Sequence, residues 1–216
     1  MADHAAIEIE DLSLKFDGRS VVEDFSLTVR AGEKVLLMGP SGSGKSTLLL
    51  CLLGLAEPQS GAIRIEGTPL DPGSAWDLRR RMAWVAQEPE LGGGTAREAL
   101  EHPFQYRANA ELKDNLERLP SLMEQFRLPE WVLDKEMSTL SGGEKQRIAL
   151  ISALLLARPI ILLDEVSSAL DAESKQAVMT FLRAAEGQTV LCVSHDREWA
   201  SAVDRVVQLT SKGGAP

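Results

Sequence analysis

Cysteine is scarce in this sequence: only Cys51 and Cys192, among 216 residues, carry a thiol. Both lie among aliphatic residues, which is typical of small buried side chains that fill a core. Two isolated cysteines provide neither a disulfide framework nor the ligands of a structural zinc site. We therefore expect both thiols to be free and buried.

Long apolar runs are also missing. The longest, residues 148–157, is interrupted by Ser152 and stops at Arg158, whereas a membrane-spanning helix needs about 20 apolar residues. The sequence does not open with the basic and then apolar pattern of a secretory leader. These absences favour a protein that stays in the cytoplasm.

Positive charge is not in excess either. The chain has 23 Lys and Arg against 32 Asp and Glu, a formal net charge of −9, which argues against a general nucleic-acid-binding surface. A local anion site is still allowed, because physiological salt screens charges beyond about 8 Å. With 44% hydrophobic residues, a chain of this length predicts one compact unit with a substantial core.

What the sequence does contain is a glycine-rich loop after the short apolar run 35–38, which suits a strand buried on both faces. Its glycines allow tight turns that aim backbone N–H groups at phosphate oxygens, and the helix that follows presents its positive end to an anion. In such loops the lysine reaches the β- and γ-phosphates and the serine hydroxyl ligates Mg²⁺. The loop consists of Gly39, Pro40, Ser41, Gly42, Ser43, Gly44, Lys45, Ser46 and Thr47.

A second apolar run, residues 160–163, ends in Asp164 and Glu165. Alone, this pattern is equally typical of a core strand that reaches the surface. Beside a phosphate loop it predicts more: Asp164 would hold Mg²⁺ through water or Ser46, and Glu165 would polarise the water that attacks a γ-phosphate.

Two further apolar runs end in polar residues, 83–86 in Gln87 and 190–193 in Ser194 and His195. Ligands of open α/β sheets bind at the carboxyl ends of the strands. A lone histidine after a strand is usually structural, but these neighbours favour a catalytic role for His195.

Residues 140–147, LSGGEKQR, resemble the signature of the ATP-binding-cassette (ABC) ATPases. The other segments are similar to the motifs of that family in the family's order: the phosphate loop to Walker A, Gln87 to the Q-loop, Asp164 and Glu165 to Walker B, residues 168–171 to the D-loop, and His195 to the switch histidine. Phe16 lies where the family has an adenine-stacking aromatic, usually Tyr, so the ring is retained and the hydroxyl is lost.

The resemblance, which covers about residues 7–209, implies an enzyme that binds ATP and Mg²⁺ and hydrolyses ATP. It implies Ser46, Gln87 and Asp164 as magnesium ligands, and Lys45 and Gln87 as catalytic partners of Glu165 and His195. Ser141, Gly142 and Gly143 would contact the γ-phosphate held by the opposite subunit, so the resemblance implies a head-to-tail homodimer that sandwiches two ATP molecules.

The fold that we expect is α/β, a P-loop NTPase of the ABC type. It has a mostly parallel central sheet, an antiparallel β subdomain and a helical subdomain, all within one nucleotide-binding domain spanning residues 1–216. We expect residues 1–87 and 140–210 to form the core with the β subdomain, and residues 88–139, where glycines and prolines punctuate short helical stretches, to form the helical subdomain.

The local pattern predicts the individual elements. Strands are expected over 7–16, 21–29, 35–38, 63–65, 83–86, 160–163 and 189–193, and helices from Ser46, over 144–157 and over 172–185. Asp17-Gly18 is typical of a turn, Thr95 of a helix cap and Pro129 of a first helical turn. The last five residues are expected to fray.

The resemblance also implies a partner, an integral membrane permease on a separate chain, and a place on the cytoplasmic face of the inner membrane. In the family the permease binds between the Q-loop and the helical subdomain, here about residues 87–106, with Trp84, Leu91, Phe104 and Tyr106 as apolar candidates. Residues 95–107 and 128–135 are similar to the ATPase subunit of the bacterial Fet-type iron-efflux system, and residues 91–94 depart from it.

Other transporters remain open. An ATPase subunit for lipoprotein release, phosphate or amino acids would share every nucleotide motif, and so would a soluble cassette protein of iron–sulfur assembly. The sequence lacks the long coiled-coil insertion of DNA-repair cassettes and the tandem copies usual in translation-associated ones. Transport of iron or another metal ion out of the cell is the substrate hypothesis that the resemblance favours.

Overall fold

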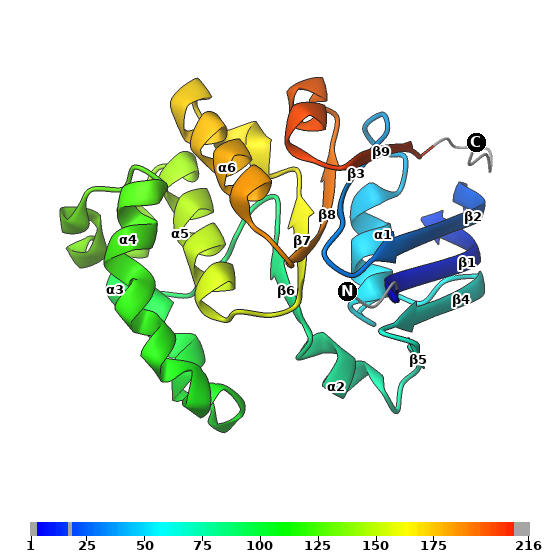
Figure 1. The fold of residues 1–216 in the computed structure, drawn as a ribbon, viewed down its shortest axis with the longest axis horizontal. Coiled ribbons are helices and arrows are strands. Elements are labelled where there is room, and N and C mark those ends of the chain that lie inside the picture. Colours follow the sequence, from blue (N-terminus) through cyan, green and yellow to red (C-terminus); the bar gives the residue numbers. More distant parts are fainter. Residues whose placement is uncertain (1–3, 17–18, 210–216) are drawn as a thin grey trace.

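The structure is built around a five-stranded parallel sheet. The computed structural model describes residues 4–16 and 19–209, and its central strands follow the order β6-β7-β8-β3-β9 (Figure 1). Strands β3, β7 and β8 are buried along their whole length, as expected for parallel strands covered on both faces. The strands are β3 Lys34–Met38, β6 Met82–Val85, β7 Ile160–Asp164, β8 Thr189–Ser194 and β9 Arg205–Gln208.

A second, antiparallel sheet of four strands lies beside it in the order β2-β1-β4-β5. Apolar side chains alternate along its long strands, and Ile7 on β1 lies opposite Val29 of β2 and Ile65 of β4. All three are fully buried, so one face of this sheet turns to the core. The strands are β1 Ala5–Phe16, β2 Arg19–Arg30, β4 Ser60–Ile65 and β5 Thr68–Pro69.

The parallel sheet separates two hydrophobic clusters because successive side chains of a strand point to opposite faces. Leu36 belongs to the cluster shared with helices α5 and α6, whereas Leu37 belongs to the cluster shared with α1 and the antiparallel sheet. Figure 1 shows this layering, with α1 between the two sheets and α5 and α6 on the other side. The longer helices are α1 Lys45–Leu52, α5 Gly142–Leu155 and α6 Ala172–Ala184.

Residues 88–139 form short helices, several of them 3₁₀, that cover α5 (Figure 1). The α-helices of this part are α3 Ala96–Glu101 and α4 Leu119–Gln125. The 3₁₀ helices are His102–Gln105, Arg107–Arg118, Glu130–Asp134 and Met137–Thr139. Elsewhere the chain forms a short helix α2, Ala75–Arg79, and 3₁₀ helices over Val166–Ala169 and Arg197–Ala202.

Two helices begin with reciprocal caps. The Thr95 hydroxyl accepts from the N–H of Glu98, and the Glu98 side chain accepts from the N–H of Thr95; Ser141 and Glu144 repeat this arrangement at α5. These capping boxes satisfy main-chain donors that helix ends leave free. The cap predicted at Thr95 is therefore confirmed.

The predicted strands all occur, with ends that differ by at most a few residues. Three predictions were wrong or incomplete. The signature helix begins at Gly142 rather than residue 144, Pro129 precedes its 3₁₀ helix as the cap residue, and the short elements β5, α2 and β9 were not foreseen. The turn predicted at residues 17–18 and the tail from residue 212 lie outside the described residues.

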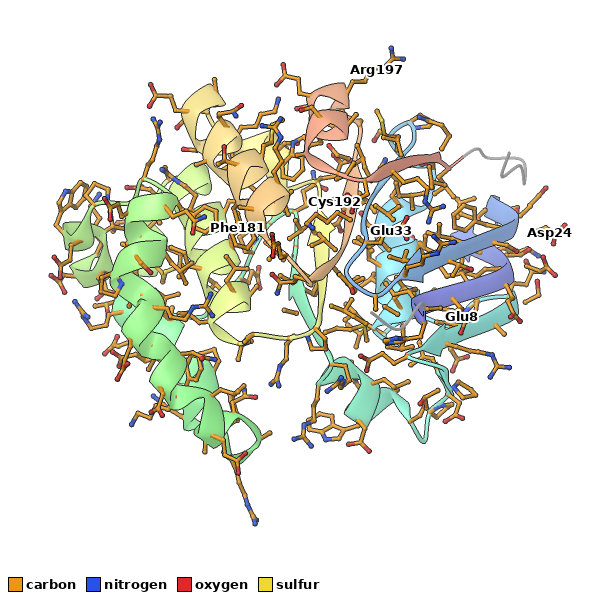
Figure 2. The ribbon with its side chains drawn as sticks, in the orientation of Figure 1. Glu8, Asp24, Glu33, Phe181, Cys192 and Arg197 are labelled. Atoms are coloured by element: carbon orange, nitrogen blue, oxygen red, sulfur yellow. The ribbon has the colours of Figure 1, made fainter. Side chains whose placement is uncertain are left out.

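Both cysteines are free and buried, as predicted. Cys192 lies in β8, at the centre of the molecule (Figure 2), and burial raises the pKa of its thiol well above the ordinary value. Burial likewise raises the pKa of Cys51 to about 11. At physiological pH both groups are therefore neutral thiols that act as small apolar side chains.

Within residues 4–16 and 19–209, no helix is long and apolar enough to cross a membrane.

Replacing Phe126 with Ala should destabilise the protein by about 3–5 kcal/mol, the usual cost of emptying a buried aromatic site. Phe126 is fully buried, and its ring centroid lies 5.7 Å from that of Phe181 on α6. Equilibrium urea unfolding measures the change. Trp131→Ala is the matched control: Trp131 is 57% exposed and lies under the Lys135 ammonium, so its loss should cost no more than about 1 kcal/mol. Equal losses for both variants would contradict the burial of Phe126 against α6.

Candidate functional site

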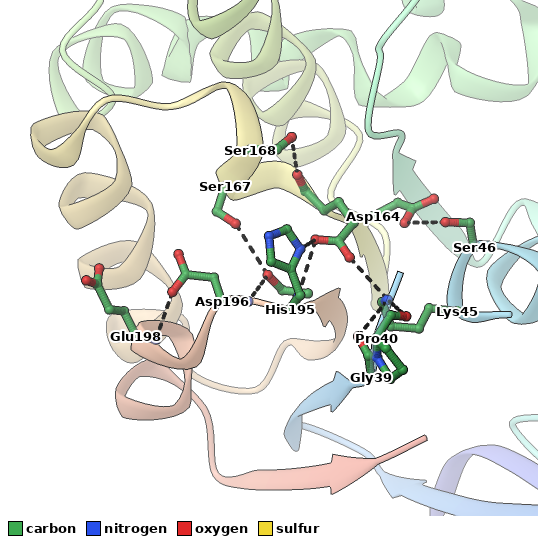
Figure 3. A network of polar contacts seen from close by, with 12 residues as sticks. Gly39, Pro40, Lys45, Ser46, Asp164, Ser167, Ser168, His195, Asp196 and Glu198 are labelled. Atoms are coloured by element: carbon green, nitrogen blue, oxygen red, sulfur yellow. Dashed lines mark hydrogen bonds and ion pairs between the residues drawn. The ribbon is translucent and has the colours of Figure 1, made fainter. Parts of the chain in front are cut away.

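The carboxyl ends of β3, β6, β7 and β8 meet at one edge of the parallel sheet, and the predicted site residues follow these ends. Six residues of the phosphate loop, together with Gln87, Glu165 and His195, surround a cavity of about 480 Å³ that lies over the start of α1 (Figure 3 shows the polar contacts at its base). The cavity is lined by Val21, Ser41, Gly42, Gly44, Lys45, Ser46, Thr47, Gln87, Glu165 and His195.

The phosphate loop packs too tightly for side chains at two of its glycines. A Cβ atom on Gly39 would lie 2.7 Å from Ser43 Oγ and 2.8 Å from the carbonyl oxygen of Leu209. Gly44 has φ +91°, and a Cβ there would lie 2.8 Å from a methyl group of Val22. The left-handed backbone and the close neighbours both require glycine, and they fix the loop against β2 and the end of β9.

Lys45 is buried at the base of the cavity. Its Nζ donates to the carbonyl oxygens of Gly39 at 2.9 Å and Pro40 at 3.0 Å, and it lies 3.3 Å from Glu165 Oε1. The ammonium thus sits at the centre of the phosphate loop, surrounded by oxygens. Phosphate oxygens are of the same chemical kind, so an incoming phosphate could replace these partners.

Ser46 and Asp164 place two oxygen atoms that could ligate a metal ion beside Lys45. The Ser46 hydroxyl donates to Asp164 Oδ1 at 2.9 Å, and Asp164 is only 4% exposed. Burial raises the pKa of Asp164; the Glu165 carboxylate adds to this, and the Ser46 hydroxyl and Lys45 oppose it. A hydroxyl and a carboxylate suit Mg²⁺, which usually takes few protein ligands and completes its shell with water and phosphate.

Glu165 is held between two partners. His195 Nδ1 lies 2.8 Å from Glu165 Oε2, and the His195 N–H donates to the same oxygen; Lys45 approaches the other oxygen. Glu165 has φ +46°, a left-handed conformation that is uncommon outside glycine and often occurs at functional sites. The carboxylate is buried while the imidazole is largely exposed, so His195 forms the wall of the cavity toward solvent.

A polar network fixes the chain around His195 (Figure 3). The Ser194 hydroxyl accepts from the N–H of Asp196 and lies 3.3 Å from the Ser167 hydroxyl. Lys175 of α6 forms ion pairs with Asp196 and Glu198. Burial lowers the pKa of Lys175, but its two carboxylate partners outweigh this and raise it overall.

The structure does not bring every predicted residue into the cavity. Ser141, Gly142 and Gly143 lie at the start of α5, outside the cavity lining. Gly143 packs on the 3₁₀ helix after Glu165, where a Cβ would lie 2.8 Å from the carbonyl oxygen of Ala169. Their predicted contact with the opposite subunit's nucleotide stays a prediction.

The side chain of Phe16, the predicted adenine platform, lies outside the described part of the structure. Val21, on β2, lines the cavity and was not singled out from the sequence. The sequence could not identify it, because the alternation of β2 does not indicate which of its residues faces the phosphate loop that follows β3.

A second groove, of about 450 Å³, lies between β6 and α5. It is lined by Trp84, Pro89 and Leu91 from β6 and the loop after it, and by Ala149 and Ala153 of α5, among others. Trp84 is 38% exposed. The predicted permease contacts need one correction, because Phe104 is buried in the core. Tyr106 is exposed but does not line this groove, and its contact with a permease stays a prediction.

Sequence comparison identifies the class of protein that this fold and cavity define. Residues 22–168 match the family model of the ABC transporter, which covers more than half of the chain. The chain therefore belongs to the ABC transporter family and is of its ATP-hydrolysing type.

Individual relatives agree on this class. The chain is 33% identical over 215 residues to the probable iron export ATP-binding protein FetA of Escherichia coli (strain K12), covering 96% of this chain and 92% of that protein. It is 33% identical to the energy-coupling factor transporter ATP-binding protein EcfA1 of Latilactobacillus sakei, covering 97% and 76%. A dimeric ATP-binding cassette in a post-hydrolysis state bound to ADP and Pi superposes with a TM-score of 0.81 at 29% identity, covering 96% of each chain.

Replacing Asp164 with Asn should stabilise the nucleotide-free protein at neutral pH. A carboxyl whose pKa is raised on folding loses stability as pH rises above its ordinary value, and asparagine retains an acceptor for the Ser46 hydroxyl. The thermal midpoint should rise by about 2–4 °C at pH 7, the effect of about 1 kcal/mol in a domain of this size. The gain should vanish below the ordinary pKa of 3.8, where Asp164 is protonated in both states.

Asp171→Asn is the matched control. The N–H of Ser174 donates to Asp171 and lowers the pKa of that carboxyl, so removal of this charge should leave the midpoint unchanged or lower it. A rise for both variants, or a gain at Asp164 that persists in acid, would contradict burial as the cause.

Proposed function

We propose that this chain binds and hydrolyses ATP at the cavity described above and that this hydrolysis powers a membrane transporter. The observation that supports the proposal most is the position of Glu165, whose buried carboxylate lies 3.3 Å from Lys45 Nζ and 2.8 Å from His195 Nδ1. A base, a cation and an imidazole thus meet above a phosphate loop at the carboxyl ends of parallel strands.

Each residue has a proposed role. The loop N–H groups and Lys45 bind the phosphates, and Lys45 exchanges its carbonyl partners for phosphate oxygens. Ser46, Asp164 and Gln87 hold Mg²⁺, which supplies neutralisation of phosphate charge when it is bound. Glu165 accepts the proton of the attacking water, and His195 steadies the γ-phosphate. Phe16 stacks on adenine.

The cavity is proposed to be completed by a second copy of the chain. Ser141, Gly142 and Gly143 lie outside the cavity of their own chain, and the similar post-hydrolysis cassette is dimeric. In a head-to-tail homodimer these residues would meet the γ-phosphate of the opposite subunit. Closure of the dimer on ATP would move a bound permease, and loss of phosphate would reopen it.

Glu165→Gln tests the catalytic assignment. Glutamine keeps the shape and the hydrogen bond with His195 but is a far weaker base, so ATP turnover should fall by about 10²–10⁴-fold while ATP binding is retained. With ATP and Mg²⁺ the variant should elute as a dimer from a sizing column, and with ADP as a monomer. Turnover at the parental rate would remove Glu165 from its role, and elution as a monomer with ATP would contradict the proposed sandwich.

The proposed partner is a polytopic permease on a separate chain, bound in the groove between β6 and α5 at the cytoplasmic face of the inner membrane. The groove has an apolar floor, with Glu88 and Glu90 also in its lining, as suits an exposed docking surface, and it adjoins Gln87 at the end of β6. Iron or another metal ion is the proposed substrate, moved out of the cell, because FetA is named as an iron export protein. Among the described residues, no group of three or more His, Cys, Asp or Glu could hold that metal, and we place its selectivity in the permease.

Other transport functions are weaker candidates. Relatives at the same identity serve energy-coupling factor transporters, and ATPases for lipoprotein release, phosphate, amino acids or iron–sulfur assembly share the nucleotide motifs. The identity of the permease decides among them.

Tagged Glu165→Gln protein, added with ATP and Mg²⁺ to detergent-solubilised native membranes, should capture one polytopic membrane protein, identified by mass spectrometry. Combining Trp84→Ala with Glu165→Gln should reduce the capture at least about tenfold, as expected for an aromatic anchor that the partner buries. Trp84→Ala alone, with Glu165 retained, should keep its ATPase activity in the isolated protein. Trp76→Ala, an exposed tryptophan outside the groove, is the matched control and should capture normally. Recovery of soluble proteins alone would contradict the transporter, and recovery of a permease unrelated to metal export would contradict the substrate.

A further inference from the structure

Gln146 lies in the signature segment but outside the residues assigned to the nucleotide. It occupies the second turn of α5 and is only 1% exposed. A buried glutamine must satisfy two donors and an acceptor, which is why glutamine is rare in cores.

The side chain of Gln146 connects α5 with the end of β6. Its Nε2 donates to the carbonyl oxygen of Ala86 at 3.1 Å, and Ala86 is the residue directly before Gln87. The two bonded residues are 60 positions apart in the chain. This bond therefore fixes the main chain from which the Gln87 side chain extends into the cavity.

The other end of the amide has no partner. Among the described residues, Gln146 Oε1 is buried without any hydrogen bond. A reversed amide would face Oε1 toward the Ala86 carbonyl, so the bond to Ala86 settles its orientation. A buried acceptor that lacks a donor destabilises a fold. An apolar side chain of the same size would avoid this cost but would leave the Ala86 carbonyl oxygen without the donor that Gln146 provides. These two effects oppose each other, so stability gives glutamine little advantage over an apolar residue here.

Gln87 itself has little else to hold it. Its side chain is exposed, and no hydrogen bond to it occurs in the described part of the chain. Its position in the cavity depends on its main chain, which is bonded to α5 through Gln146. The same face of α5 continues through Ala149 and Ala153 into the groove against β6, so the bond closes the end of that groove nearest the cavity.

We propose that Gln146 is a positioning residue, which holds the main chain at Ala86 against α5 and so places Gln87 for ATP hydrolysis. The proposal rests on the role assigned to Gln87 above. It concerns the isolated ATPase and does not depend on the identity of the permease. Any displacement of α5 relative to β6 would be transmitted to Gln87 through this bond.

Gln146→Met tests the proposal, because methionine retains the shape and removes both the donor and the unpartnered acceptor. In the full chain, kcat for ATP should fall between about threefold and tenfold, the effect of one neutral hydrogen bond, with KM within about twofold. The thermal midpoint should change little, because loss of the unpartnered acceptor offsets loss of the donor to the Ala86 carbonyl oxygen. Gln146→Leu provides a second apolar variant if methionine impairs folding.

A double-mutant cycle separates positioning from a general structural effect. If Gln146 acts through Gln87, the variant Gln87→Ala with Gln146→Met should have the same kcat as Gln87→Ala alone. If the double variant lost the full factor of both single variants in kcat, the two residues would act independently and the proposal would be overturned. An unchanged kcat for Gln146→Met would overturn it as well. Unchanged turnover for Gln87→Ala would overturn the role of Gln87 and the proposal together, whereas an inactive Gln87→Ala with a fully active Gln146→Met would overturn the proposal only.

Gln188→Met is the matched control. The Gln188 amide likewise donates to a main-chain carbonyl oxygen, that of Arg158, at 3.2 Å. Gln188 lies directly before β8, at the amino ends of the strands and therefore away from the cavity. Its kcat should change by less than about twofold. An equal loss of kcat for this variant would show that the effect is not specific to the end of β6, and would also overturn the proposal.

Discussion

Two adjacent buried carboxylates, Asp164 and Glu165, are the constraint around which the site is arranged. Each must be stabilised where the sheet excludes water, and burial of such groups is costly unless they are paired. Ser46 donates to the first and Lys45 approaches the second. The phosphate loop, the first turn of α1 and the end of β7 are therefore held together by charge as well as by packing, and the site has its geometry before nucleotide arrives.

Because of this arrangement, the cavity lies directly on the most deeply buried strands of the sheet. The strands that end at Asp164 and at Ser194, directly before His195, are buried on both faces, which gives the proposed catalytic groups a rigid base. The strain lies at their ends, where Glu165 takes a left-handed backbone and its carboxylate is held by Lys45 and His195. A phosphate that competes for Lys45 would release part of this restraint on Glu165 at the moment when a base is needed.

Much of this could be predicted from the sequence because the signals are local. Apolar runs of four or five residues predicted β3, β7 and β8, and the residues that follow them had to meet at one edge because the strands are parallel. Local signals did not reveal β9, whose pattern is short and largely exposed and which is stabilised by pairing with β3 and by the ion pair of Arg205 with Glu33. Nor did they show that Phe104 enters the core while Trp84 faces a groove, or that Val21 reaches the cavity. Those outcomes depend on contacts between distant segments.

The contact between Gly143 and Ala169 has a consequence for any assembly of two copies. It joins the loop proposed to meet a neighbouring copy with the 3₁₀ helix that directly follows Glu165. The two segments pack so closely that a Cβ on Gly143 would lie 2.8 Å from the Ala169 carbonyl oxygen. A small movement after Glu165 would therefore be carried to the loop proposed to meet the neighbour. In a dimer of two such chains, a movement at each chain's own site would thus shift the loop that meets the other chain's site, so the two sites would be coupled in both directions.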